Sequence, residues 1–502
     1  MKTLRLLLPW LGLLALGRAD VTLAPLFQDH AVLQRFQPVP VWGLAAPGEH
    51  VTVSFQGQQI GTTTGADGRW IVYLAPLAAS AEPAALVVVG KNTVTVRDVL
   101  VGEVWLASGQ SNMEWPLLKA ANGPAEVAAA NHPLLRLFSV QHQVADQPAT
   151  TVTGTWQPCT PEAVKMFSAV EYYFGRDLQR KLGVPVGLIG SYWGGTAVEA
   201  WMSEATLKST AAFPALDARW QKSLAEFPQK QASYPSDMAA WKKAEEAAKA
   251  THTANPVPWP PPPVGPGTPY ALSGLFNGMI APLQPYALRG VIWYQGEANW
   301  PRPDEYAELF PAMIRGWRAG WGQGDFPFLF VQLANFTVTN DPTGRGWARL
   351  RDAQAHALTL PATGMAVALD IGDPKDIHPR NKQEVGRRLA LLAKTQTYGI
   401  PGDVSGPVFA FTTPERSALR IHFDHAGTGL ISANRPVQSL EIAGADRKFY
   451  PATGKIERDT LLVSAREVKE PVAVRYAWSN APVANLFNGA GLPAAPFRTD
   501  DW

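Results

Sequence analysis

One serine stands where a nucleophile could act. An apolar run at residues 104–107 leads through Gly109, which permits a tight turn, to Ser111. If the run is a strand, Ser111 lies at its carboxyl end, where open α/β sheets place their ligands, and its backbone N–H can face a developing oxyanion. An isolated serine in this position more often caps a helix. Candidate partners later in the chain favour the catalytic interpretation.

Two later blocks could supply the rest of an oxyanion site. Gly194 and Gly195 follow an apolar run at residues 186–190, and such a pair lets a backbone N–H approach within about 3 Å of a substrate oxygen. Gln295 follows a third apolar run, and its amide can donate to the same oxygen. Glu297 can hold Gln295 or the serine loop in place. Taken alone, each block could also be an ordinary turn or a polar loop.

A candidate base follows in an acidic segment. Serine attack needs a general base, and the base needs an acceptor on its far nitrogen. Asp376 precedes His378 by two positions, so in an extended segment the two side chains leave the same side. Asp373 is the alternative carboxylate if Pro374 folds the loop back. Glu297, or no carboxylate at all, completes the possibilities.

The candidate residues need a sheet to bring them together. Apolar strand-like runs alternate with helical stretches through the middle of the chain, which predicts an α/β domain with a parallel sheet. The predicted strands are residues 103–107, 186–190, 290–294, 328–332 and 365–368. We place this domain at residues 98–405.

Shorter alternating runs flank the central region on both sides. Residues 20–97 predict a small β-sandwich, and residues 406–502 predict a second β module. Pro38 and Pro40 place one run of the first module on a sheet edge, because proline cannot donate to a ladder.

The central domain is interrupted at about residues 203–270. Residues 237–250 are rich in Ala, Lys and Glu and predict an exposed helix, whereas residues 255–269 contain eight prolines and predict neither helix nor central strand. The interruption is either a solvated spacer or a substrate-contacting flap that carries Trp241 and Trp259.

Composition narrows the class of protein. A chain of 502 residues has room for two or three domains, and a formal net charge of +2 offers no general attraction for nucleic acid or membrane lipid. Cys159 is the single cysteine and is interpreted as a packed residue. Residues 1–19 read as a secretory signal with cleavage after Ala19, since their apolar run is shorter than the roughly twenty residues of a membrane span. A periplasmic or secreted protein, with no membrane anchor after cleavage, is expected.

The catalytic blocks, in this order, resemble the sialate O-acetylesterase family within the SGNH hydrolases. The matching segments are residues 109–113, 194–196, 293–297 and 376–389, and the resemblance extends to residues 26–34 and to the carboxyl-terminal module. It implies a flavodoxin-like three-layer domain and a Ser-His-Asp mechanism that needs no metal or other cofactor. It also implies Ser111 as the nucleophile, His378 as the base, and Gly195, Gln295 and the Ser111 N–H as oxyanion donors. Many SGNH enzymes have Asp three residues before the histidine, where this chain has Lys375, so the choice between Asp376 and Asp373 stays open.

The predicted activity is hydrolysis of an O-acetyl ester on a carbohydrate, either a sialic acid or a plant-wall glycan. Trp193 or Trp293 could wall a tight acetyl pocket. The carboxylate of a sialic acid would need a basic partner, for which the candidates are Arg302, Arg345 and Arg349.

Two other functions are compatible with parts of the sequence. A glycoside hydrolase could pair Glu297 with Asp370, Asp373 or Asp376, although this leaves the serine block unexplained. A noncatalytic carbohydrate-binding protein could use the two β modules. Loss of acetate release in Ser111→Ala separates the esterase from both.

Overall fold

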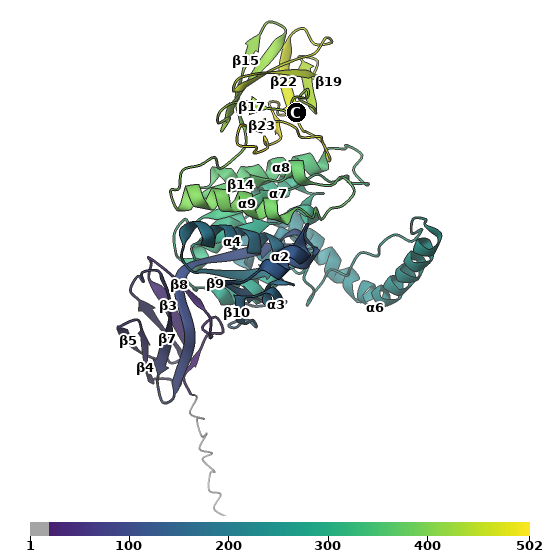
Figure 1. Cartoon of the computed structure of the whole chain (residues 1–502). Coiled ribbons are helices and arrows are strands. Elements are labelled where there is room, and N and C mark those ends of the chain that lie inside the picture. Colours follow the sequence, from purple (N-terminus) through teal and green to yellow (C-terminus); the bar gives the residue numbers. More distant parts are fainter. Residues whose placement is uncertain (1–19) are drawn as a thin grey trace, which may run out of the picture.

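The computed structural model describes residues 20–502, which form a central α/β body with a β module at each end (Figure 1). Residues 1–19, where the secretory signal is predicted, lie outside the described part. Within residues 20–502, no helix has both the length and the apolar character needed to cross a membrane.

The central body is built on a sheet whose strands run in the order β10-β9-β11-β8-β12-β13-β14. All neighbouring pairs are parallel except β10 with β9. The strands are β8 (Thr93–Gly109), β9 (His132–Ser139), β10 (Trp156–Cys159), β11 (Val186–Tyr192), β12 (Gly290–Tyr294), β13 (Phe328–Gln332) and β14 (Thr363–Val367). The five predicted strands are confirmed: four agree with the structure to within two residues at each end, and β8 begins ten residues earlier than the predicted strand at 103–107. β9 and β10 were not predicted, because their prolines and polar residues interrupt the apolar pattern.

The five predicted strands have the flavodoxin-like order implied by the resemblance. Numbered along the chain, β11-β8-β12-β13-β14 is the order 2-1-3-4-5. β9 and β10, which were not predicted, extend the sheet beyond β11. In this order, β8 lies directly between β11 and β12, and the three loops that follow these strands are neighbours.

Helices cover both faces of the sheet. On one face Trp105 packs against Phe174 of α4 (Ala169–Leu182), which lies beside α9 (Lys382–Leu392). Trp293 is in register with Ser108, so it points to the opposite face, where it stacks on Phe310 of α7 (Pro303–Trp321) beside α8 (Gly346–Ala355). Trp293 is fully buried in this aromatic layer and is core, so its predicted role as a wall of the acetyl pocket is wrong.

The amino-terminal module is continuous with the central sheet. Its strands are β1 (Thr22–Leu23), β2 (Val32–Gln34), β3 (Val39–Leu44), β4 (His50–Phe55), β5 (Gln58–Thr63), β6 (Arg69–Leu74) and β7 (Ser80–Val89). β8 pairs with β7 in its first half and with β11 and β12 in its second, so the 97/98 boundary predicted for the domains falls inside one strand. The edge position predicted for β3 is wrong, because β3 lies between β1 and β6. The short β1 reaches only Gly43 and Leu44, which leaves the Pro40 end of β3 without a partner on that side.

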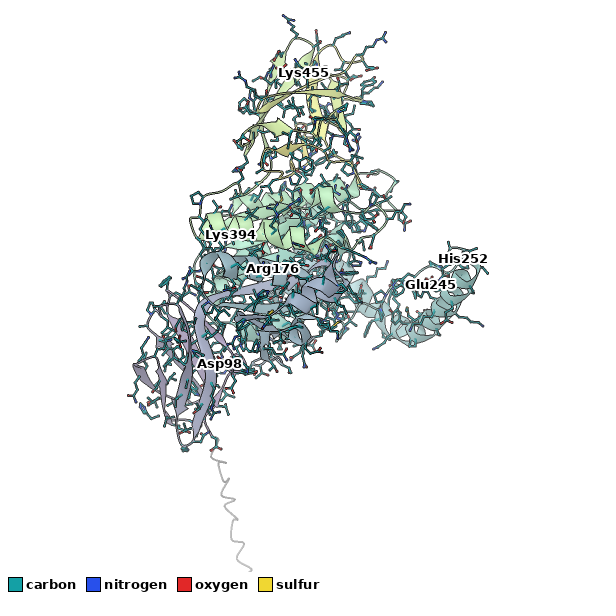
Figure 2. The ribbon with its side chains drawn as sticks, in the orientation of Figure 1. Asp98, Arg176, Glu245, His252, Lys394 and Lys455 are labelled. Atoms are coloured by element: carbon teal, nitrogen blue, oxygen red, sulfur yellow. The ribbon has the colours of Figure 1, made fainter. Side chains whose placement is uncertain are left out.

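The interruption of the central domain forms an arm. After α5 (Glu204–Lys208), helix α6 (Phe213–Thr251) runs for 39 residues away from the body, and Glu245 and His252 mark its far end (Figures 1 and 2). The predicted exposed helix is confirmed and is longer than expected. The proline-rich strap that returns along it contains no helix or strand through Pro269, and Trp259 of the strap packs on Trp241 with ring centroids 4.6 Å apart.

The carboxyl-terminal module is all β. One sheet has the order β15-β16-β21-β20 and another β19-β18-β22-β24, with β17 and β23 forming a pair. The strands are β15 (Val408–Glu415), β16 (Ala418–Asp424), β17 (Leu430–Ile431), β18 (Leu440–Gly444), β19 (Phe449–Pro451), β20 (Thr453–Glu457), β21 (Thr460–Ser464), β22 (Pro471–Tyr476), β23 (Phe487–Asn488) and β24 (Phe497–Arg498). The buried guanidinium of Arg351 in α8 donates to the carbonyls of Ser479 and Asn480, which joins this module to the body.

Candidate active site

The structure brings Ser111 and His378 together. Ser111 is the first residue of α1 (Ser111–Glu114), directly beyond β8, and its Oγ lies 2.8 Å from Nε2 of His378. Gly109 turns the chain with φ +136°, and a Cβ there would lie 2.2 Å from the carbonyl oxygen of Tyr294 in β12. Only glycine therefore lets β8 and β12 run this close beside the serine.

The imidazole of His378 is held by stacking and by a distant carboxylate. Its ring stacks on Trp115 with centroids 5.0 Å apart. Asp376 accepts a 2.9 Å hydrogen bond from the backbone N–H of His378, but its Oδ1 stays 3.9 Å from Nδ1 of the ring. Asp373 instead accepts from the backbone N–H of Lys375. Of the two predicted carboxylates, Asp376 is the one beside the ring.

The electrostatic surroundings favour neutral imidazole. Burial and the positive charge of Lys382 lower the pKa of His378 below its ordinary value of 6.5, and the negative charge of Asp376 opposes this. A neutral imidazole can accept the proton of a serine hydroxyl, whereas an imidazolium cannot.

The glycine pair after β11 lies against the serine. A Cβ on Gly194 would be 3.2 Å from the Cβ of Ser111, and the Gly194 N–H donates to Oε2 of Glu114 at 2.6 Å. Gly195 has φ +76°, and within residues 20–502 its N–H makes no hydrogen bond, as is also true of the Ser111 N–H. These two N–H groups are free to meet a substrate oxygen.

Gln295 does not join them. Its buried amide donates to the carbonyl of Thr196 at 3.2 Å and to Oδ1 of Asn299 at 2.7 Å, and its Oε1 accepts from the hydroxyl of Tyr306. Because both amide hydrogens are committed, Gln295 can donate to a substrate oxygen only by giving up one of these bonds, and its oxyanion role stays a prediction. Gln295 ties the loop after β12 to the loop after β11.

Glu297 holds the serine loop, which was one of its two predicted roles. Its Oε1 accepts a 2.5 Å hydrogen bond from Nδ2 of Asn112, the residue after the nucleophile. Burial raises the pKa of Glu297 above its ordinary value. The carboxyl group is buried behind the serine, which disfavours the catalytic pair that a glycoside hydrolase would need.

Four residues around the site were not singled out from the sequence: Asn112, Glu114, Trp115 and Lys382. The first three lie within or beside the serine block, where only Ser111 was given a role. Lys382 is buried and shares a stripe of α9 with Val385, Gly386 and Leu389, at the spacing of a packed helix face. A lysine at the spacing of the buried helix face was therefore the sequence signal that could have identified Lys382.

The other residues considered from the sequence lie in ordinary settings. The predicted sialic acid contacts Arg302, Arg345 and Arg349 pair with Glu199, Glu441 and Asp304 respectively. Cys159 is buried, as predicted, and burial raises the pKa of its thiol to about 12. Trp193 stacks on His142 beside the glycine pair. Residues 20–502 contain no group of three or more His, Cys, Asp or Glu side chains arranged to hold a metal ion.

Comparison with known proteins bears on the family. A family profile described as "Carbohydrate esterase, sialic acid-specific acetylesterase" matches residues 267–394. The sialate O-acetylesterase of Rattus norvegicus is 31% identical to the chain, covering 94% of it and 93% of the rat protein, and that of Homo sapiens is 30% identical, covering 91% and 88%. The chain belongs to the sialate O-acetylesterase family. This membership confirms the resemblance drawn from the catalytic blocks.

A solved bacterial structure extends the similarity to three dimensions. The structure of a carbohydrate acetylesterase from Xanthomonas citri is 41% identical and covers 96% of this chain and 100% of its own, with a TM-score of 0.82. The family likeness therefore includes both β modules and is not limited to the catalytic blocks.

Proposed function

We propose that this member of the sialate O-acetylesterase family hydrolyses O-acetyl esters on carbohydrates, with Ser111 as nucleophile and His378 as general base. The observation that carries the proposal is the 2.8 Å contact between the Ser111 hydroxyl and Nε2 of His378 at the carboxyl ends of the central strands. The family supports the ester class, and the geometry supports the residues.

The reaction runs through an acetyl-enzyme. His378 takes the hydroxyl proton as Oγ attacks the acetyl carbonyl, and the resulting oxyanion faces the N–H groups of Ser111 and Gly195. The bond to the sugar oxygen then breaks, and the imidazolium returns the proton to that oxygen. Water attacks the acetyl-enzyme with His378 again as base, which frees acetate and restores the serine.

Asp376 is proposed as the third member of the triad. It is the carboxylate beside the ring, and a negative charge there stabilises the imidazolium that forms during attack. Its 3.9 Å separation from Nδ1 is longer than a hydrogen bond, so a shift of the loop on substrate binding would strengthen this contact.

We also propose domain boundaries for the chain and its export from the cytoplasm. We assign the body, residues 98–405, to an SGNH-like esterase domain with an arm at about 203–270, flanked by β modules at 20–97 and 406–502. The charged start and short apolar run of residues 1–19 support export through a cleaved signal.

Acetate release tests the proposal. Purified wild type and Ser111→Ala are compared on a chromogenic acetate ester and on a panel of O-acetylated sialic acids, xylans and xyloglucans. We expect acetate from the wild type and a loss of several orders of magnitude in the variant, with unchanged thermal unfolding. Equal rates in the two proteins would refute the serine mechanism, and the best substrate in the panel identifies the sugar.

A further inference from the structure

A buried lysine lies behind the two reacting side chains. The side chain of Lys382, at the start of α9, is fully buried, and its Nζ donates to Oδ1 of Asn112. Its ammonium also lies 5.3 Å from the ring centre of Tyr294 and 5.8 Å from that of Trp115. Burying an ammonium group away from water costs free energy unless the group is paired and hydrogen-bonded. The catalytic cycle above gives Lys382 no role.

Asn112 connects Lys382 to both reacting residues. It follows Ser111 in the chain, and its Nδ2 donates to the carbonyl of Ile377 at 2.9 Å, one residue before His378. The same nitrogen donates to Glu297 at 2.5 Å. One side-chain amide thus ties the serine helix to the histidine loop, and Lys382 and Glu297 hold its two ends.

The tie through Asn112 matters because the contact between the triad carboxylate and the histidine ring is weak in this protein. In a serine triad, a carboxylate bonded to Nδ1 fixes the ring, but here Asp376 stays 3.9 Å away and is partly exposed, with 44% of its side chain in solvent. The position of His378 then depends also on its other contacts, among them the Trp115 stack, the hydrogen bond from its backbone N–H to Asp376, and the bond from Asn112 to Ile377.

We propose that Lys382 is a positioning residue that, through Asn112, holds the serine helix and the histidine loop at reacting distance, and whose positive charge keeps His378 in its neutral, basic form. This inference rests on the proposed serine mechanism.

Two charged groups act on His378 in opposite directions. The charged groups that act on His378 are Asp376 of its own loop, which favours the imidazolium, and Lys382 of α9, which disfavours it. Burial lowers the pKa of Lys382 to about 7, while Glu297 and Asp376 support its charged form. At the acidic pH where His378 titrates, Lys382 therefore carries its charge.

Lys382→Met removes the charge and the donor while keeping the length of the side chain. We expect kcat on a chromogenic acetate ester to fall about 10- to 100-fold with little change in KM, since a buried hydrogen bond to a charged group is lost. We also expect the acidic limb of the kcat/KM profile to move to higher pH by about 0.5 to 1 pH unit, because the imidazole is then protonated more easily. Lys382→Arg keeps the charge and should leave the limb in place.

Lys394→Met is the matched control. Lys394 is half-buried in the segment that continues α9, about 18 Å further along, and its pKa is also lowered by burial (Figure 2). It should keep wild-type kcat and pH profile.

The outcomes separate the two claims. A folded Lys382→Met with an unmoved acidic limb, or with kcat within twofold of wild type, overturns the inference while Ser111→Ala stays inactive. If Ser111→Ala is as active as the wild type, the serine mechanism fails instead. Should Lys382→Met not fold, Asn112→Leu decides: it breaks the same tie, and activity within twofold of wild type would overturn the positioning role.

Discussion

Ser111 and His378 lie 2.8 Å apart, but the segments that carry them are held differently. Ser111 follows β8, which is hydrogen-bonded to β11 on one side and β12 on the other. His378 lies eleven residues beyond Val367, the end of the edge strand β14, on a loop with one helical turn at Leu369–Ile371. The nucleophile is fixed by the sheet, and the base is fixed by contacts between loops.

This difference suits the chemistry of each residue. The serine and its N–H donors must match a tetrahedral carbon, where an error of about 1 Å is costly. The base takes a proton twice, from Ser111 and from water, and returns it twice, to the sugar oxygen and to Ser111, which a loop with limited freedom permits. Apart from the two reacting residues themselves, changes to the groups that hold the serine and its N–H donors should therefore cost more activity than changes to the carboxylates of the base loop.

The base itself gives the largest expected effect. His378→Ala removes the proton acceptor, and we expect kcat to fall by about 10⁴-fold or more, as triad removals do. His422→Ala, in a histidine stacked on Phe411 in the carboxyl-terminal module, is the control and should keep full activity. Initial rates of acetate release measure both. A His378→Ala enzyme with a tenth of wild-type activity would mean that another group acts as base.

The second prediction concerns Glu114, on the side of the site that the sheet holds in place. Glu114→Ala removes the 2.6 Å bond that holds the Gly194 N–H, so the adjacent Gly195 N–H loses its fixed direction. We expect kcat to fall about 10- to 100-fold, approaching the loss of one oxyanion donor, with KM little changed. Glu162→Ala, at an exposed carboxylate of α3 (Pro161–Val164), is the control. A loss confined to KM would show that Glu114 contacts substrate instead.

The carboxylates of the base loop should have a smaller effect. Asp376→Asn removes the charge that raises the pKa of His378, so that pKa falls further and the neutral base persists to lower pH. We expect about a tenfold loss of kcat, because the carboxylate stabilises the imidazolium without a hydrogen bond to it, and an acidic limb moved to lower pH.

Asp373→Asn is the matched partner. Within residues 20–502 the Asp373 carboxylate accepts a hydrogen bond only from the Lys375 N–H, so the activity of this variant should stay within twofold of wild type. kcat/KM profiles from pH 4 to 9 compare the two variants. The reverse ranking would assign Asp373 as the triad carboxylate.

The strands, Ser111 and His378 could be predicted from the sequence because each lies in its own local pattern. An apolar run predicts a buried strand, and a glycine with a serine at its end predicts the turn. The two bonds that hold the Gln295 amide were missed. The bond to Asn299 spans four positions, but the bond to Thr196 joins loops 99 positions apart and exists only once the sheet has formed.

Two strands of the central sheet were missed for a related reason. β9 and β10 extend the sheet beyond β11, but prolines and polar residues interrupt their apolar pattern, so no local signal marked them as strands. Pro40 did mark a missing partner, but only on one side of one end of β3, because β1 is two residues long. Lys382 was passed over because a lysine suggests a surface, and its burial is visible only through its apolar neighbours on α9.

A change in the arm should have the smallest effect on the reaction. Its effect shows whether the arm is a spacer or a flap that contacts substrate. The far end of the arm projects away from the central body (Figure 1), but the chain returns at Tyr270, whose hydroxyl lies 3.7 Å from where a Cβ of Gly195 would be. Trp241→Ala removes the packing that pins the strap to α6. We expect kcat on a small acetate ester to stay within twofold, since no reacting group moves, and KM for an acetylated oligosaccharide to rise about two- to threefold because the strap holds Tyr270 less firmly. Equal KM values for the long substrate would make the arm a spacer, and a loss on the small ester would place it in the chemistry itself.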